Sequence, residues 1–292
     1  MNPLVNKIFI DSGAHTLYNK KVLGVGKSGY EFFKTAEFFQ YVDEYAEFIK
    51  KHIDAIDYYA NVDVIYNPEL SWNTLKYLEE KHGLKPLPVI HCNTPLSWID
   101  KHLDAGYTYL GIGGLGQGIT KDVFKVWADR LFTRICPAPD YLPIVKTHGF
   151  AMTAYGLLFR YPWYSVDSAT WAKAGGFGKI MVPHKRNGKF VYDIRPYEVF
   201  VSEESPSAKI HGKHYLTLNA SEKSIIKEWL ELIKVPLGTL SKPDTPDDFG
   251  VLNRHVERKQ ANLMFFEKML ESLPTYPWPY KVSRTATVGF GI

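Results

Sequence analysis

Cysteine is scarce in this chain, because only Cys92 and Cys136 occur among its 292 residues. Two cysteines cannot build a disulfide framework or a four-cysteine zinc site, so we expect two reduced, buried thiols and no bound zinc. The sequence contains no run of 18 apolar residues, and we therefore expect no membrane-spanning helix. The first residues, MNPLVNKIFIDSG, show no cleavable signal pattern, which favours a cytoplasmic location.

Charge of one sign is concentrated in only one segment. The formal net charge is +4, which by itself is too small to indicate nucleic-acid binding. Between Ser168 and Tyr192, however, no acid occurs, whereas five basic residues do: Lys173, Lys179, Lys185, Arg186 and Lys189. Such a run is typical of a solvated face or of a surface that holds phosphates. The nearby aromatic residues fit either base stacking or core packing, namely Tyr161, Trp163, Trp171 and Phe177.

Short apolar runs alternate with helical patterns through the first two thirds of the chain. The runs that predict strands are residues 8–11, 58–65, 87–91, 107–114, 142–150, 163–168 and 178–183. Between them, capping residues, apolar faces of helical spacing and glycines predict helices, for example from Thr35 to His52. This alternation predicts an α/β fold with a parallel sheet, and the number of strands favours a closed (β/α)8 barrel of the TIM type.

The alternation weakens after Pro183. GKFVYDI and YEVFVSEE predict edge strands or a hairpin, residues 221–234 and 247–272 predict helices, and VPLGTLSKPDTPDD between those helices predicts a surface loop. We therefore expect residues 1–200 to form the barrel core. Residues 201–292 would complete the barrel and add a helical and hairpin extension, all within a single domain.

Functional side chains of a parallel barrel stand at the C-terminal ends of its strands. The predicted strand ends here carry Asp11, Asp63, His91, Gly113 with Gly114, His148 and Asp167. A single Asp at a strand end commonly makes a turn or caps a helix. Three of them at one barrel mouth indicate a chemical site, whereas a hydrogen-bonded structural role is the expectation for His148.

Four segments at these strand ends carry a family resemblance. DSGAH (residues 11–15) is similar to a DSGGFQ-type motif, YLGIGGLGQG (residues 109–118) to an IGGL-containing strand and loop, and PVIH (residues 88–91) stands in place of a VQG-type strand end. These motifs belong to tRNA-guanine transglycosylases. The segment HGFAMTAYGLLFRYPWYSVDSATW (residues 148–171) more closely resembles phage-type DNA-guanine transglycosylases, which replace guanine in DNA by 7-deazaguanine bases. The resemblance covers residues 8–183 in consistent order.

The resemblance implies base exchange through a covalent glycosyl–enzyme intermediate. By motif position, Asp167 would attack the sugar C1′, and Asp11 would be the general acid and base. Asp63 would accept hydrogen bonds from the donor edge of guanine. Other substrate contacts would come from Ser12, His91, Gly113 and Gly114.

The same resemblance implies the partners. These would be DNA and a 7-deazaguanine base such as preQ0 or a derivative, with no cofactor, in the host cytoplasm if the chain is phage-encoded. Contacts to the nucleic-acid backbone would come from Lys173, Lys185, Arg186 and Lys189.

The chain departs from the family in three places. The tRNA enzymes hold a structural zinc with three cysteines and a histidine, which two cysteines cannot supply. His91 replaces a glutamine, and the RNA-binding C-terminal module of the archaeal relatives has no counterpart. These departures favour DNA over tRNA as the acceptor. Exchange into tRNA, a non-catalytic barrel that binds nucleic acid or a partner subunit, and a sugar hydrolase remain as alternatives.

Overall fold

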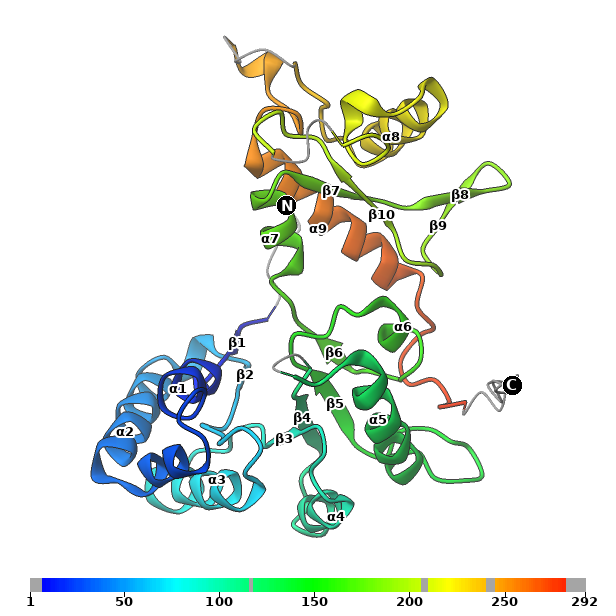
Figure 1. Cartoon of the computed structure of the whole chain (residues 1–292). Helices are drawn as coiled ribbons and strands as arrows, with labels where there is room; N and C mark the ends of the chain where they lie inside the picture. The colour runs from blue at the N-terminus through cyan, green and yellow to red at the C-terminus, as the bar shows by residue number, and fades with distance from the viewer. Residues whose placement is uncertain (1–6, 116–117, 206–209, 240–244, 282–292) are drawn as a thin grey trace, which may run out of the picture. The chain divides into compact units, whose positions relative to one another are not determined.

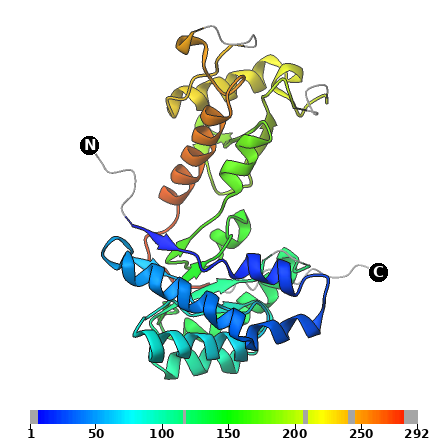
Figure 2. The same ribbon diagram turned by 90° about the vertical axis from the view of Figure 1, so that its left-hand side faces the viewer.

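The structure is a computed structural model, which describes residues 7–115, 118–205, 210–239 and 245–281. The chain divides into two compact units with interleaved segments (Figures 1 and 2). Unit 1 comprises residues 1–152, 161–167 and 276–292, and unit 2 comprises residues 153–160 and 168–275. This division differs from the expected single domain with a boundary near residue 200, because the main crossing between the units falls at residue 168.

Unit 1 is built on parallel strands that follow one another in chain order. They are β1 (Phe9–Ile10), β2 (Tyr58–Tyr59), β3 (Val89–His91), β4 (Tyr109–Gly113), β5 (Lys146–Gly149) and β6 (Ser165–Val166). β1 pairs with β2, β3 to β6 form a second sheet, and a parallel bridge between Ala60 and Leu87 joins the two. The predicted α/β class and the parallel pairing are thus confirmed.

Helices connect these strands, and local sequence signals fix where they begin. They are α1 (Ala14–Lys21), α2 (Ala36–Lys51), α3 (Pro68–His82), α4 (Leu96–Asp104) and α5 (Lys121–Ile135), with short 3₁₀ helices η1 (Lys27–Lys34) and η2 (Ile53–Ala55). The side chains of Thr35, Asn67 and Thr120 accept hydrogen bonds from the first turns of α2, α3 and α5. Gly83 ends α3 with a φ of 67°.

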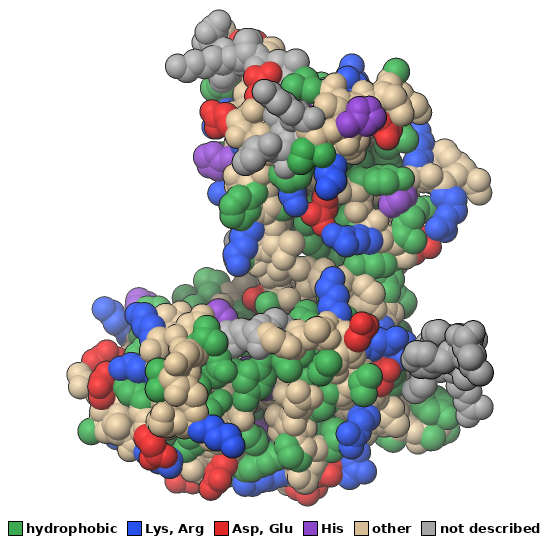
Figure 3. Space-filling model, in the orientation of Figure 1, with side chains coloured by type: hydrophobic (Ala, Val, Ile, Leu, Met, Phe, Trp, Pro, Cys, Tyr) green, Lys and Arg blue, Asp and Glu red, His purple; other side chains and the backbone are tan. Residues whose placement is uncertain are grey.

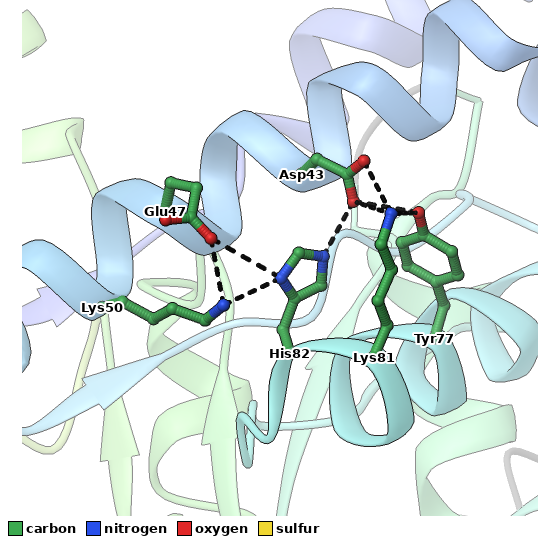
Figure 4. A network of polar contacts seen from close by, with 6 residues as sticks. All are labelled: Asp43, Glu47, Lys50, Tyr77, Lys81 and His82. Atoms are coloured by element: carbon green, nitrogen blue, oxygen red, sulfur yellow. Dashed lines mark hydrogen bonds and ion pairs between the residues drawn. The ribbon is translucent and has the colours of Figure 1, made fainter.

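A network of polar contacts joins α2 to α3 (Figure 4). Asp43 accepts hydrogen bonds from Tyr77 at 2.9 Å, from Lys81 at 2.9 Å and from His82 at 2.7 Å. Burial pushes the pKa of Asp43 up, but these hydrogen bonds outweigh it and lower the pKa to about 2. Asp43 is therefore charged under ordinary conditions and holds the two helices together.

The parallel sheet of unit 1 is strongly curved. Four strand spacings separate β1 from β5, which would be about 19 Å in a flat sheet at about 4.8 Å per strand. Yet the rings of Phe9 on β1 and His148 on β5 stack with their centroids only 4.6 Å apart. Tyr109 on β4 likewise packs edge-on against Tyr58 on β2, at 5.3 Å. Aromatic side chains thus fill the concave face.

The expected closed barrel is not formed by the described strands. The predicted barrel strand at residues 178–183 becomes β7 (Lys179–Val182), which belongs to unit 2 and pairs antiparallel with β10 (Tyr197–Phe200). The apolar pattern of this segment indicated a buried strand correctly. It could not indicate the direction of the partner strand, because an apolar run carries no information about the strand with which it pairs.

Unit 2 places short sheets against helices. Besides β7 and β10 it contains α6 (Tyr155–Leu158), α7 (Thr170–Gly176), the hairpin β8 (His184–Arg186) and β9 (Lys189–Val191), η3 (Tyr215–Thr217), α8 (Ala220–Leu232), η4 (Pro246–Asp248) and α9 (His255–Glu271). The helices expected at residues 221–234 and 247–272 are present, the second one beginning later than expected. In the expected loop between them, residues 240–244 lie outside the described residues.

Two buried side chains on α9 hold unit 2 together. Asn262 donates to the carbonyls of Trp171 and Lys179, both at 3.1 Å, and accepts from the N–H of Met181 at 2.7 Å. Arg258 donates to the carbonyl of Gly175 at 3.0 Å. These bonds satisfy backbone groups of α7 and β7, so α9 is an integral part of unit 2.

Candidate functional site

The C-terminal ends of the parallel strands in unit 1 carry the polar side chains that the sequence indicates. Asp11 directly follows β1, His91 ends β3, Gly113 ends β4 and Asp167 directly follows β6, while Asp63 lies a short loop beyond β2. Since these strands run parallel in chain order, their C-terminal ends lie along one edge. Unit 1 therefore gathers the expected carboxylates at one edge of its sheet.

The Asp11 carboxyl is exposed to solvent, yet its surroundings disfavour its charge. Desolvation by the neighbouring protein raises the pKa of Asp11 above the usual carboxyl range, and the negative charges of Asp63 and Asp167 raise it further. The backbone N–H of Gly13, which donates to Asp11 Oδ1 at 3.3 Å, acts in the opposite direction. A carboxyl that keeps its proton to higher pH is suited to act as a general acid.

The turn after Asp11 is fixed by α2. The hydroxyl of Tyr41 donates to the carbonyl of Ser12 at 2.5 Å, and Gly13 adopts a φ of 73°, where a Cβ would approach the Tyr41 hydroxyl oxygen to 2.7 Å. Ser12 is 2% exposed, and its hydroxyl oxygen has no hydrogen-bond partner among the described residues. The expected substrate contact is thus a buried hydroxyl with unused hydrogen-bonding capacity.

Asp63 and His91 form a buried pair. Nε2 of His91 lies 2.6 Å from Oδ2 of Asp63, and their side chains are only 9% and 6% exposed. A carboxylate can only accept, so Nε2 carries the proton of the pair. Nδ1 of His91 is buried without a hydrogen-bond partner among the described residues. Asp63 is therefore already engaged by a protein donor through one oxygen.

The glycines at the end of β4 and directly after it leave room for neighbouring protein atoms. A Cβ on Gly113 would lie 3.0 Å from Cε1 and 3.1 Å from Nδ1 of His91. Gly114 adopts a φ of 98°, and a Cβ there would lie 2.8 Å from the backbone nitrogen of Cys92. The space that Gly113 leaves open is thus filled by the His91 ring, whereas a contact with the substrate was expected at this glycine. Residues 116–117, within the resembling segment, lie outside the described residues.

Asp167 has an exposed carboxylate. Its side chain is 58% exposed, and Oδ1 accepts a hydrogen bond from the N–H of Ala151 at 2.8 Å. Nε2 of His148, which is buried beneath it on β5, lies 3.5 Å from the same oxygen. Ala151 adopts a φ of 52°, which is unusual for a residue with a side chain. A hydrogen bond to a strained turn therefore orients the carboxylate.

The basic segment lies in unit 2, and much of its charge is paired there. Lys179 forms an ion pair with Glu198 at 3.1 Å, Arg186 with Asp193 at 3.1 Å, and Lys185 with Glu228. Lys173 and Lys189 are exposed, and within the described ranges neither forms an ion pair. On the face of the molecule drawn in Figure 3, Lys and Arg side chains are interspersed with acidic ones. Because three of its five basic residues are paired with acids, the segment is not a continuous basic stripe.

The aromatic residues near this segment have different environments. Tyr161 is 0% and Trp163 5% exposed, and both pack on Phe132 in the core of unit 1. They cannot stack on a base without unfolding. Trp171 is half-buried, and Phe177, at the end of α7, is 73% exposed. Of the four, Phe177 is the one whose ring is open to a ligand.

Neither a metal site nor a membrane span is found in the part of the chain that the structure describes. There, no cluster of three or more His, Cys, Asp or Glu is arranged to hold a metal ion, and no helix is long and apolar enough to cross a membrane. Cys92 and Cys136 are both free and buried, and burial raises their pKa to about 11 and about 12. Both thiols are therefore protonated and unreactive near neutral pH.

Comparison of the chain with models of protein families, with curated proteins and with solved structures finds no match.

Sequence reasoning missed the residues that lie behind the site. Ser165 and Tyr109 form a hydrogen-bonded chain with His148, and Tyr41 holds the turn after Asp11. A signal for two of them was available: alternation along a strand places Tyr109 on the same face as Gly113, and Ser165 on the same face as Asp167. No local pattern indicates Tyr41, because α2 lies outside the sheet.

Proposed function

We propose that unit 1 is a glycosyl-transfer centre that exchanges guanine in DNA for a 7-deazaguanine base. One observation carries the proposal: Asp11, Asp63 and Asp167 lie at the C-terminal edge of a curved parallel sheet, where desolvation and, to a smaller extent, the charges of Asp63 and Asp167 raise the pKa of Asp11. Carboxylates in unlike environments are what breakage of a glycosidic bond requires, since one must ionise and another must carry a proton.

Asp167 is the nucleophile in this proposal. Its Oδ1 is held by the N–H of Ala151, which leaves Oδ2 to attack the sugar C1′. As the new C1′–O bond forms, the C1′–N9 bond to guanine breaks, and its electron pair goes to the base. A nearby carboxylate also stabilises the oxocarbenium character that develops at C1′.

Asp11 moves the proton in both directions. In its protonated form it gives the proton to the leaving guanine. As a carboxylate it then takes the N9 proton of the incoming base, whose nitrogen attacks C1′ and releases Asp167. The raised pKa of Asp11 supports the first of these steps, because the group must be protonated when the base leaves.

The Asp63–His91 pair supports recognition of the base. One oxygen of Asp63 is held by His91, so the other remains to accept from the N1–H and N2–H₂ groups of guanine. Nδ1 of His91 and the Ser12 hydroxyl are buried groups without hydrogen-bond partners among the described residues. Buried polar groups of this kind discriminate strongly against a ligand that leaves them unpaired.

The proposal includes a finer assignment of the fold. The six parallel strands of unit 1, in chain order, correspond to the first six strands of a (β/α)8 barrel. The stacking of Phe9 on His148 across the concave face supports this, because only a sheet that curls toward closure brings β1 and β5 together. Functional groups at the C-terminal strand ends are also typical of such barrels.

DNA is the favoured acceptor because two buried cysteines cannot hold the zinc of the tRNA enzymes. The exposed tip of the β8–β9 hairpin, where Asn187 and Gly188 form the turn between Arg186 and Lys189, is a candidate contact for phosphates. Arg186 is ion-paired within unit 2, but exposed pairs of this kind are weak and open readily.

The test is an exchange assay with labelled guanine on single-stranded DNA, duplex DNA and tRNA. Single-stranded DNA should react fastest, since extruding a paired base costs a few kcal/mol. Asp167→Asn should reduce exchange by several orders of magnitude and abolish the covalent adduct, whereas the control Asp140→Asn, at an exposed aspartate between α5 and β5, should react like wild type. Exchange into tRNA alone would identify tRNA, and not DNA, as the acceptor. No adduct with any nucleic acid would reject the proposal.

A further inference from the structure

His148 is held rigidly below Asp167. It is 4% exposed, its ring stacks on Phe9 at 4.6 Å with an interplanar angle of 17°, and Phe150 packs edge-on against it at 4.5 Å. Gly111 on β4 makes room for this arrangement, because a Cβ there would lie 2.6 Å from the Phe150 ring. The two aromatic rings thus fix the plane of the imidazole and the directions of its nitrogens.

One nitrogen of this ring ends a hydrogen-bonded chain. Nδ1 of His148 lies 2.6 Å from Oγ of Ser165, which lies 2.5 Å from the hydroxyl of Tyr109. Burial raises the pKa of Tyr109 to about 12, so its hydroxyl keeps its proton at neutral pH. With Tyr109 donating to Ser165, the single proton of Ser165 is free to donate to Nδ1. This polarity leaves the proton of a neutral imidazole on Nε2.

The other nitrogen faces the proposed nucleophile. Nε2 of His148 is buried without a hydrogen-bond partner among the described residues, and Oδ1 of Asp167 lies 3.5 Å away. That separation exceeds the usual length of a hydrogen bond, but catalytic hydrogen bonds are often long in a ligand-free protein and shorten in the complex. The opposite polarity would put a lone pair on Nε2 against the lone pairs of the carboxylate, which is unfavourable.

We propose that Tyr109, Ser165 and His148 form a positioning relay that presents an Nε2–H to Asp167. The proposal deepens the proposed function and rests on it for its catalytic consequence. When the incoming base attacks C1′, the C1′–Oδ2 bond breaks and its electron pair returns to the Asp167 carboxylate. The Nε2–H of His148 stabilises this returning charge, while Asp11 takes the proton of the base. His148 neither gains nor loses a proton in this step.

The relay has a test that does not depend on activity. In the full chain labelled with ¹⁵N-histidine, the His148 signals are assigned by their loss in His148→Gln. We expect the tautomer with the proton on Nε2. Ser165→Ala should shift the population toward the Nδ1-protonated form, whereas the control Ser97→Ala, at an exposed serine on α4, should not. A wild-type ring protonated on Nδ1, or a tautomer unchanged by Ser165→Ala, would overturn the relay.

The catalytic consequence is tested on the covalent intermediate. His148→Phe should lower kcat by about 10²-fold, as loss of one donor to a developing oxyanion does, and KM for DNA should fall with it, because breakdown of the adduct becomes rate-limiting. The adduct should accumulate, because its breakdown is slowed. His148→Gln should restore part of the rate, since a side-chain amide can donate. Wild-type kinetics in His148→Phe would refute the role. A wild-type protein without any adduct would instead refute the proposed function, and the tautomer would still decide the relay.

Discussion

Gly113→Ala tests whether the glycine at the end of β4 exists to admit the His91 ring. The new Cβ would lie 3.0 Å from Cε1 and 3.1 Å from Nδ1 of His91, whereas comfortable contacts between carbon atoms are about 3.5–4.0 Å. Gly113 has no left-handed backbone conformation, so alanine carries a steric cost alone. The ring must therefore move by about 0.5 Å, away from the position at which it meets Asp63.

The size of the effect follows from two contributions. Overpacking of a tight interior costs about 1–3 kcal/mol. Displacement of the ring also stretches the 2.6 Å contact between Nε2 of His91 and Oδ2 of Asp63. This weakens a buried hydrogen bond to a charged group, and such a bond is worth about 1.5–3 kcal/mol. Since the hydrogen bond is stretched rather than broken, only part of the second contribution is lost, and we expect unit 1 to lose about 2–4 kcal/mol, which corresponds to about 30- to 900-fold faster exchange of its most protected amides.

Hydrogen exchange followed by mass spectrometry is the suitable assay, because peptides of unit 2 serve as an internal reference. Peptides from β3 and β4 should exchange faster in Gly113→Ala, while those from α9 should not change. Gly156→Ala is the matched control, since a Cβ there meets no atom within 4 Å. In a His91→Ala background, Gly113→Ala should cost little, because the obstructing ring is gone. Unchanged exchange in β3 and β4 of Gly113→Ala would refute this reasoning.

Three further changes have expected outcomes. Asp11→Asn removes a carboxyl whose raised pKa makes its charge unfavourable in the folded protein. Thermal scans should therefore show a Tm higher by a few degrees at pH 7, and this gain should disappear below about pH 4, where the carboxyl is protonated in both the folded and the unfolded chain. Base exchange into DNA should fall by about 10²–10⁴-fold in the same variant. The charge of Asp43, whose pKa is lowered to about 2, has the opposite effect and stabilises the fold above about pH 4. Wild type should therefore have a higher Tm than Asp43→Asn above about pH 4, and the difference should shrink as the pH falls from about 4 to 2. The double variant Lys185→Gln, Arg186→Gln should make the plot of log DNA affinity against log salt concentration less steep, by about 1.4–1.8. An unchanged slope would show that the hairpin does not contact the DNA backbone.

Local signals were sufficient for the helices and for the positions of the candidate groups. Thr35, Asn67 and Gly83 fix where helices begin or end through contacts within a few residues, which the sequence alone determines. Asp11 and Asp167 were expected at strand ends because apolar runs stop immediately before them, and the structure has them there. Parallel pairing of the first strands also followed from the alternation of strands and helices.

Contacts between distant segments decided the rest. The run at residues 178–183 has the composition of a barrel strand, but its direction and unit were set by β10, with which it pairs antiparallel. The segment at Lys185 contains no acid, yet Glu228 neutralises that lysine from α8. His148 is the neighbour of Asp167 because β5 and β6 pair in parallel in the register that sets His148 opposite Ser165, two residues before Asp167. Strand partners, ion pairs and buried contacts between distant residues depend on the whole packed chain, which no local pattern encodes.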